Sequence, residues 1–395
     1  MKKLIIILGI VFIFSLPLFS YSVVAYADTS EEELIDQIEE SVNGQLEDLD
    51  LSGLESILNN LNKEQSEMFG SGTFIEKLQS ILSGEFSGNA GSVWEAILGL
   101  IFDELLNFLP LIATIIAVAI LSGMIGDLRG ANSKSIADIT HFVCYGVIII
   151  LVVSACTSIL TLTSNTLQGL KNQIDVAFPI LLTILTAIGG TSSVSVYQPA
   201  VALFSGTIMQ IFTLVLMPLF IFSLVFTVIS NLSSSVKLEK FSSFFNSLFK
   251  WITGAVFTIF MGFLIIQGIT AGSLDTVSIR TAKYAIRSYI PILGGYLSEG
   301  FNVIMASSIL IKNAIGASGL LLMFSSVIVP VVEIVLLMLC LKLTAGILEP
   351  LTDSRISNFI SGVAKSLIMP IVLIIGVAFM YLIFMGLIIC TGNFI

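Results

Sequence analysis

AIGASGLLLMFSSVIVPVVEIVLLMLCLKLTAGIL, residues 314–348, is the stretch that decides the fold. It holds only two charged residues, Glu333 and Lys342, and a helix needs about 20 mostly apolar residues to cross the hydrocarbon core of a bilayer. The stretch is therefore long enough to span a membrane. The proline inside it, Pro330, predicts either a kink or two shorter helices.

Five further stretches are apolar over a comparable length. Hydrophobic residues form 56% of the sequence, charged residues form 11%, and the mean hydropathy is +1.03. In an ordinary globular protein about 25% of the residues are charged. We therefore expect an all-α, polytopic membrane protein with about six long spans, the other five near residues 109–126, 141–163, 199–231, 251–271 and 367–391.

The N-terminal 95 residues precede the spans and differ from them in composition. Residues 1–27 combine a basic start, an apolar run and an Ala25-Tyr26-Ala27 cleavage signal, which is typical of a secretory signal peptide. An uncleaved anchor helix is the alternative. Residues 28–95 hold 16 acidic and 2 basic residues, a net charge of 2 − 16 = −14. This charge repels phosphates, so we expect no nucleic-acid partner, and it suits a basic protein partner.

Residues 28–95 also carry helix signals. Ser30, Ser52 and Thr73 are each followed three positions later by Glu, as in the capping box at a helix start. The apolar stripes that follow are too narrow to form a core alone. We expect short, exported amphipathic helices that pack on a partner or on the membrane surface, followed by a transmembrane domain over residues 96–395.

Prolines begin apolar runs at matched spacings. They are Pro110, Pro218 and Pro330, which start long runs, and Pro179 and Pro291, which start shorter ones. The first three are 108 and 112 residues apart, and each of the last two precedes its long-run partner by 39 residues. A duplication into parallel repeats, residues 175–271 and 287–391, and chance matches between apolar sequences are equally good explanations.

The shorter runs are residues 177–190, which end at Gly189-Gly190, and residues 290–310, which Gly294-Gly295 interrupts. Matched short segments in two halves of a membrane protein are typical of half-helices that line a pathway. We expect both runs to be re-entrant or interfacial, because irregular backbone at membrane depth needs cover from protein or water. The residues that we assign to a candidate pathway or to its packing are Glu333, Lys342, Pro179, Gly189, Gly190, Pro291, Gly294 and Gly295.

Charged residues in the spans are costly in lipid and are candidate functional residues. Glu333 and Lys342 should face the bundle interior or a cavity, and for Glu333 a transport role competes with a structural hydrogen bond. On a helix, one face would carry Arg280, Lys283 and Arg287. Export of the N-terminus places this basic stripe outside, against the positive-inside rule. Either the topology is wrong, or the stripe binds anionic headgroups, or it meets something acidic, such as the acidic segment 28–95 or a passing substrate. Of these we favour contact with protein.

The sequence contains no familiar catalytic or metal-binding motif. It has no GxxxxGK[ST] phosphate loop, no HExxH and no GxSxG. The four cysteines lie singly in apolar runs, and the one histidine, His141, stands at the start of a span. We therefore expect no enzyme activity, no catalytic residue, no metal and no cofactor.

The run DTVSIRTAKYAIRSYIPILGGYLSEGFNVIMASSILIKNAIGASGLLLM, residues 275–323, resembles the stage III sporulation protein AE family of endospore-forming Firmicutes, most specifically in VSIRTAK and LIKNAIG. The signal peptide, the acidic exported segment, the polytopic remainder and the length are similar to that family too. The resemblance implies a mother-cell protein of the outer forespore membrane, in a multi-protein channel that joins the two cells. The implied partners are other stage III A operon proteins, including a secretion-type ATPase, and forespore stage II protein Q.

Three functional hypotheses remain open on the sequence. The first is a structural, conduit-forming subunit of the sporulation channel that is needed for spore development. The second is a stand-alone secondary transporter for a small molecule, and the third is a passive membrane anchor for channel partners. Membrane lipid is a partner in all three, and the first and third require the chain to be an oligomer or a complex subunit.

Overall fold

The computed structural model describes residues 29–61, 65–66, 72–82, 90–127, 134–232, 239–289, 294–352 and 354–392. The predicted signal peptide and Pro291 lie outside these ranges. Every regular element of the described residues is helical. The N-terminal helices are α2 (Thr29–Asp48), α3 (Ser52–Asn59) and α5 (Phe74–Leu82). The helices that follow are α6 (Ala90–Asp127), α7 (Lys134–Ala187), α8 (Thr191–Ala202), α9 (Met209–Ile211), α10 (Met217–Leu232), α11 (Glu239–Tyr289), α12 (Gly294–Leu348), α13 (Ser354–Ser366) and α14 (Ile368–Cys390).

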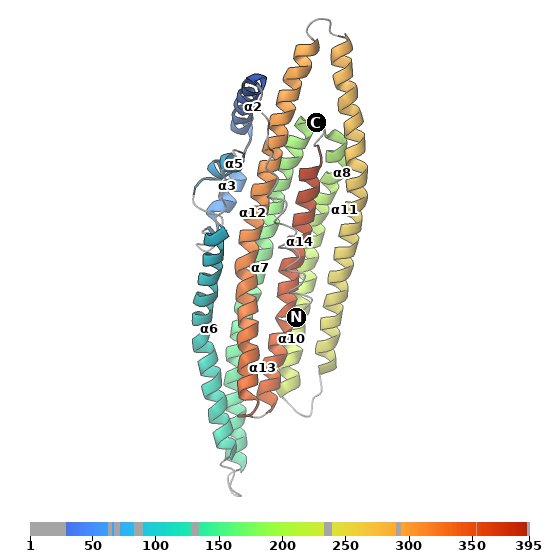
Figure 1. Cartoon of the computed structure of the whole chain (residues 1–395). Coiled ribbons are helices and arrows are strands. Elements are labelled where there is room, and N and C mark those ends of the chain that lie inside the picture. The colour runs from blue at the N-terminus through green and yellow to red at the C-terminus, as the bar shows by residue number, and fades with distance from the viewer. Residues whose placement is uncertain are drawn as a thin grey trace.

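Six helical segments are long and apolar enough to cross a membrane. They are Ile97–Met124, Phe142–Ala187, Thr191–Asn231, Lys240–Gly268, Glu299–Leu348 and Ser354–Cys390. Figure 1 shows these segments running alternately down and up the long axis of one bundle. The predicted all-α, polytopic membrane fold is therefore confirmed.

The bundle has two distinct ends, which we call lower and upper as drawn in Figure 1. Helices α6, α10 and α12 finish at the lower end, where α7, α11 and α13 begin. Helices α8 and α12 begin towards the upper end, and α2 lies beside the upper part of α12. At 1.5 Å per residue the 54 residues of α7 extend about 80 Å, so the bundle is much longer than a hydrocarbon core of about 30 Å is thick.

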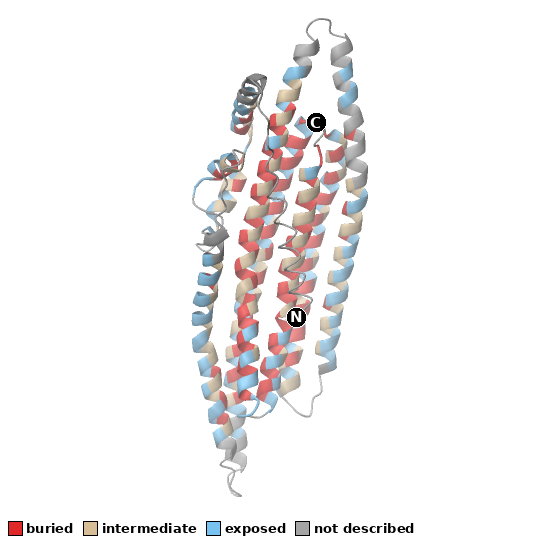
Figure 2. Ribbon diagram, in the orientation of Figure 1, coloured by how far each residue is buried: buried red, intermediate tan, exposed pale blue. Residues whose placement is uncertain are grey.

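Large apolar side chains are exposed around the lower part of the bundle. Among the most exposed are Phe102, Leu106, Leu121, Ile150, Phe222, Trp251, Ile259 and Leu343, which lie on α6, α7, α10, α11 and α12. Figure 2 shows the long exposed edges of α6 and α11 in pale blue. Exposed apolar side chains on this many helices fit contact with lipid acyl chains.

Helix α14 fills the middle of the bundle's upper half. On this helix, the ring of Phe384 is fully buried and stacks on the ring of Phe178 of α7 at a centroid separation of 4.6 Å. The same ring lies 6.1 Å from Tyr197 of α8 and 6.1 Å from Phe260 of α11, while Tyr381 of α14 approaches the Gly319 carbonyl of α12 at 3.5 Å. One side chain thus meets three surrounding helices, and the axis of the described bundle is occupied by packed aromatic groups.

The two runs expected to be re-entrant or interfacial belong instead to long helices. Residues 177–187 are the last turns of α7, which passes through Pro179 without a break, and α12 runs from Gly294 to Leu348 through Pro330. The prediction of separate short segments was wrong because it placed a break at the polar residues before Pro179. Contacts with other helices support α7 there: Gln173 donates to the Ser326 hydroxyl of α12 at 2.7 Å.

The apolar run around Pro218 stays on one path through local unwinding. Two π-helical turns, η2 (Leu203–Ile208) and η3 (Phe212–Leu216), separate α8, α9 and α10. Pro218 is the second residue of α10, two positions after the end of η3, and cannot donate a backbone hydrogen bond. A π turn absorbs such a gap without a sharp bend. This run therefore forms one crossing with local irregularities.

Helix boundaries agree with the proposed repeats in one half and disagree in the other. Helices α10 and α12 end at Leu232 and Leu348, 116 residues apart, and α11 and α13 begin at Glu239 and Ser354, 115 residues apart. However, the chain breaks at Gly189-Gly190 in the first repeat and is continuous through the equivalent part of α12 in the second. An ancestral duplication remains a prediction.

The acidic N-terminal helices pack on this chain's own transmembrane helices, rather than only on a partner or on the membrane surface as expected. Val42 and Leu46 of α2 are buried, and Gln45 of α2 donates to the Ser307 hydroxyl of α12 at 2.8 Å and accepts from Ser308 at 2.6 Å. On α3, a Cβ at Gly53 would lie 2.7 Å from the Val176 side chain of α7. These contacts hold the acidic segment in a defined place.

Candidate functional site

One face of α7 is polar and exposed over much of its length. Apart from the adjacent Thr157 and Ser158, its members follow one another at intervals of three or four residues. We call them the α7 polar face: Ser154, Thr157, Ser158, Thr161, Asn165, Gln168, Asn172 and Asp175. The opposite face is buried and apolar, with Val152, Ile159, Leu167 and Ile174. From Ser154 to Asp175 the polar face extends about 30 Å along the helix.

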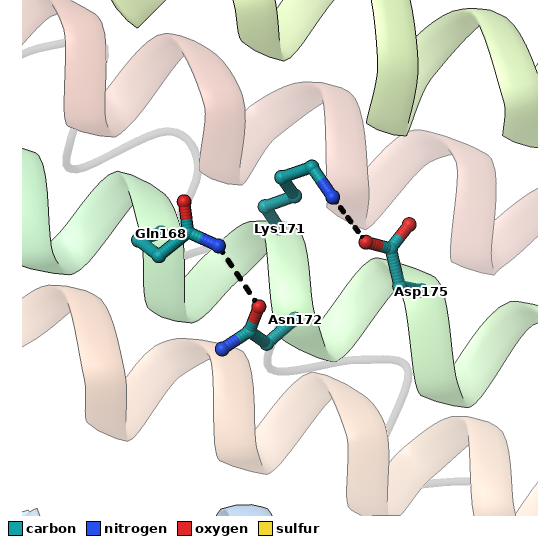
Figure 3. A network of polar contacts seen from close by, with 4 residues as sticks. All are labelled: Gln168, Lys171, Asn172 and Asp175. Carbon is teal, nitrogen blue, oxygen red and sulfur yellow. Dashed lines mark hydrogen bonds and ion pairs between the residues drawn. The ribbon is translucent and has the colours of Figure 1, made fainter.

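In the upper part of this face the polar side chains pair with one another, and their charges cancel. Figure 3 shows Gln168 donating to Asn172, at 3.0 Å, and Lys171 paired with Asp175. Both pairs join residues four positions apart on the helix, the spacing at which side chains of one helix face meet. The ion pair cancels its own charge, so the face offers hydrogen-bonding groups without a net charge.

The lower part of the face consists of small hydroxyl side chains. Thr157 donates to the Val153 carbonyl at 2.9 Å and Thr161 to the Thr157 carbonyl at 3.2 Å. These bonds to the preceding turn let hydroxyl groups lie within an apolar helix while their oxygens can still accept hydrogen bonds from water.

The lower part of the α7 polar face is level with the upper part of the candidate crossing in the neighbouring helix α6. Because α6 ends at Asp127 and α7 begins at Lys134 at the same end of the bundle, position 158 of α7 is level with about position 103 of α6. There α6 exposes Phe102 (65%) and Leu106 (62%) together with the carboxylate of Asp103, inside the candidate crossing Ile97–Met124. Polar groups at that depth require water or a polar protein surface against them.

The glycine pair at the end of α7 forms a helix cap. Gly189 has a positive φ of 88°, its N–H donates to the Thr186 carbonyl at 2.9 Å, and the N–H of Gly190 donates to the Leu185 carbonyl at 2.8 Å. This is the Schellman arrangement, in which glycine best tolerates the left-handed conformation. Gly189 and Gly190 therefore end one helix and start the next.

A buried carboxylate then fixes the start of α8. Asp275 of α11 is fully buried and accepts hydrogen bonds from the backbone N–H groups of Ser192 and Ser193, at 3.0 and 2.9 Å. A helix N-terminus presents unpaired N–H groups and a partial positive charge, both of which a carboxylate satisfies. Asp275 thereby attaches α11 to α8 at the upper end.

A buried amine fixes the end of α14 nearby. Lys312 of α12 is fully buried, and its Nζ donates to the Ile389 carbonyl at 3.0 Å and to the Thr391 carbonyl. The Thr391 hydroxyl in turn lies 2.8 Å from the hydroxyl of Tyr197 on α8. A cation at a helix C-terminus complements the unpaired carbonyl groups there, so Lys312 and Asp275 hold opposite helix ends in the same region.

The structure does not bring the predicted pathway residues together. Glu333 is half-buried on α12 with Glu104 of α6 as its electrostatic neighbour, and Lys342 is half-buried nine residues further along the same helix. Nine residues at 100° each place the two on opposite sides of α12. Neither Glu333 nor Lys342 belongs to the α7 polar face. Pro179 is exposed on α7, one turn beyond Asp175. Gly294 and Gly295 are the first two residues of α12.

The basic stripe lies on the upper end of α11. The helix continues to Tyr289, and Arg280 is exposed. Positions 283 and 287 are on the same helix, but the side chains of Lys283 and Arg287 are outside the described residues. Among the described residues, no three His, Cys, Asp or Glu side chains group so as to hold a metal ion.

The sequence interpretation missed the α7 polar face and the buried Asp275. It placed Lys312, near the start of a span, towards the bundle interior or a cavity, but did not predict the groups that Lys312 contacts. A usable signal for the face existed, since the polar residues between positions 154 and 175 recur every three or four residues. No local signal existed for the partners of Asp275 and Lys312, because these lie 83 and 79 positions away in the sequence.

Comparisons with known proteins identify the family. The model of the family described as "Stage III sporulation protein AE" matches residues 73–392. A relative of that name from Bacillus subtilis (strain 168) is 24% identical over 317 residues, which cover 80% of this chain and 79% of the relative. No solved structure matches the chain. With most of its length matched by the family model, the chain is a member of the stage III sporulation protein AE family.

Proposed function

We propose that this protein is a structural, conduit-forming membrane subunit of the complex that connects mother cell and forespore during sporulation. Family membership supports a role in sporulation, and the six apolar crossings support a multi-pass membrane location. The outer forespore membrane and a complex with stage III A operon proteins, a secretion-type ATPase and stage II protein Q are what the family resemblance implies. Residues 28–95 would then face the intermembrane space.

The observation that carries the conduit proposal is the exposed α7 polar face inside the candidate crossing Phe142–Ala187. Ser158 and Thr161 expose hydroxyl groups at the level where Phe102 of α6 faces outward, and polar groups at that level are stable beside water or polar protein. Because Phe384 and its aromatic neighbours occupy the bundle axis, the path runs beside α7, between this chain and its neighbours. The neutral, hydroxyl-rich lining suits hydrated solutes of either charge.

Single-cysteine labelling in sporulating cells tests the lining. In a background without the four native cysteines, Ser158→Cys and Thr161→Cys should react with a membrane-impermeant maleimide because water reaches them. Phe102→Cys, at the same depth on α6, is the matched control and should stay unlabelled. A bulky maleimide on Ser158→Cys should also lower the yield of heat-resistant spores, whereas labelling of Gln79→Cys, at an exposed position of α5, should not.

The conduit proposal would fail if Ser158→Cys and Thr161→Cys were as unreactive as Phe102→Cys. It would also fail if both were labelled to completion without any loss of spores, since water would then reach α7 without the face serving transport. The second outcome would favour the passive anchor hypothesis, in which water contacts α7 but no solute passes along it.

A further inference from the structure

The exposed charge of the N-terminal helices is of one sign. On the described parts of α2, α3 and α5 the exposed charged side chains are all acidic, and we call the group on and just after α2 the acidic surface: Glu39, Glu40, Glu47 and Asp50. Lys77, the basic residue of α5, is buried, and burial lowers the pKa of its amine. No described cation on these helices balances the acidic surface from within.

The acidic surface is held rigidly. On the inner side of α2, the Ser41 hydroxyl lies 2.9 Å from that of Ser307, and Gln45 bonds both Ser307 and Ser308 of α12. Between them Val42 and Leu46 are buried. Since Glu39, Glu40 and Glu47 remain exposed on the same helix, α2 presents carboxylates outward at a fixed height on the bundle.

The opposite charge stands at the same height on another side of the molecule. Helices α11 and α12 are antiparallel neighbours that meet at the upper end (Figure 1), where α11 ends at Tyr289 and α12 begins at Gly294. Ser307 is 13 positions from the start of α12, so it is level with position 276 of α11. Arg280, which is exposed, is therefore about one helical turn above that level, beside the height of Glu39 and Glu40.

Within one chain these two charged surfaces are separated. Figure 1 shows α2 on one side of α12 and the upper part of α11 on the other, well apart in the view. Surfaces of opposite charge at equal height on different sides of one subunit are what a head-to-tail contact between identical subunits requires. Arginine and carboxylates pair strongly with defined geometry, and complementary charge also selects the partner and its register.

We propose that neighbouring copies of this chain associate side by side through this contact, with the acidic surface of one copy against the Arg280 end of α11 of the next. The contact accounts for a basic stripe on the side to which the N-terminus is exported, where positive charge is otherwise disfavoured. It rests on the proposed function only in placing α2 and the upper end of α11 in one aqueous compartment.

The test is pairwise charge exchange in the full-length chain, expressed with two different tags and purified in detergent at low ionic strength. Glu39→Lys with Glu40→Lys, placed in both tagged copies, should reduce co-purification of the tags by about tenfold, because attraction becomes repulsion. Arg280→Glu alone should act in the same direction. Combining the three substitutions in every copy should restore the yield. Lys250→Glu, an exposed basic position near the lower end of α11, is the matched control and should change nothing.

A disulfide assay checks the same contact without reversing charge. In a background without native cysteines, Glu40→Cys and Arg280→Cys in one chain should give intermolecular dimers and larger species on oxidation, whereas either change alone should give at most a dimer. Failure of the triple variant to restore co-purification, with no cross-linked species, would overturn the proposal, and capture of a different protein by the acidic surface would do the same. If the copies associated as expected but Ser158→Cys and Thr161→Cys did not react with maleimide, only the proposal that the α7 polar face lines a conduit would be overturned.

Discussion

At the scale of single residues, the start of α8 depends on Asp275. Its carboxylate accepts two backbone N–H groups that have no intrahelical acceptor. Asp275→Ala should lower the free energy of unfolding by about 2 kcal/mol, the range for losing a charged, buried cap. Thermal unfolding of the purified protein in detergent measures the loss.

The matched control for Asp275→Ala is Glu349→Ala, which removes an exposed carboxylate at the end of α12 and should stay within about 0.5 kcal/mol of the parent protein. Asp275→Asn should fall between the two, because an amide oxygen still accepts one N–H group but carries no charge. If Asp275→Ala were as stable as Glu349→Ala, the carboxylate would not be holding α8.

At the scale of helices, the packing of α6 depends on a glycine at its lower end. A Cβ at Gly123 would lie 2.5 Å from the Leu351 carbonyl oxygen, just after α12. A backbone oxygen in a helix turn cannot move aside cheaply, so Gly123→Ala should destabilise the protein by about 1–3 kcal/mol, as overpacking does. Resistance of α6 to proteolysis in detergent, together with the melting temperature, reports the change.

Gly99→Ala is the control on the same helix. A Cβ there meets nothing within 4 Å, and alanine favours a helix over glycine by up to about 1 kcal/mol. Gly99→Ala should therefore leave stability unchanged or slightly raised. Equal effects of the two substitutions would mean that α6 does not approach Leu351 closely.

Some features of the helices can be predicted from the sequence and others cannot. Hydropathy predicts each of the six crossings, because the spans must be apolar in any arrangement. It does not predict that α7 continues from the apolar run at 141–163 through Asn172 and Pro179 to Ala187, because that continuity depends on contacts such as Gln173 with Ser326. The break at Gly189-Gly190 was predictable from the glycines, while its nature as a cap held by Asp275 was not, since the carboxylate comes from a distant helix.

At the scale of the whole molecule, the packing around Phe384 closes the axis of the bundle. Its ring is buried among aromatic side chains of α7, α8 and α11, so Phe384→Ala should cost about 3–5 kcal/mol of stability. Phe379→Ala, on the same helix with one aromatic neighbour, Phe257, is the matched control and should cost less. Thermal unfolding in detergent compares the two.

The same substitution separates two locations for a path. If solutes pass beside α7, Phe384→Ala leaves an apolar cavity that stays dry, and vesicles containing the variant should leak a small fluorescent dye no faster than the parent protein. If the path ran along the axis through α14, removing the ring would widen its narrowest point and leakage would rise. Leakage that increased with Phe384→Ala and not with Phe379→Ala would therefore move the conduit from the α7 polar face to the bundle axis.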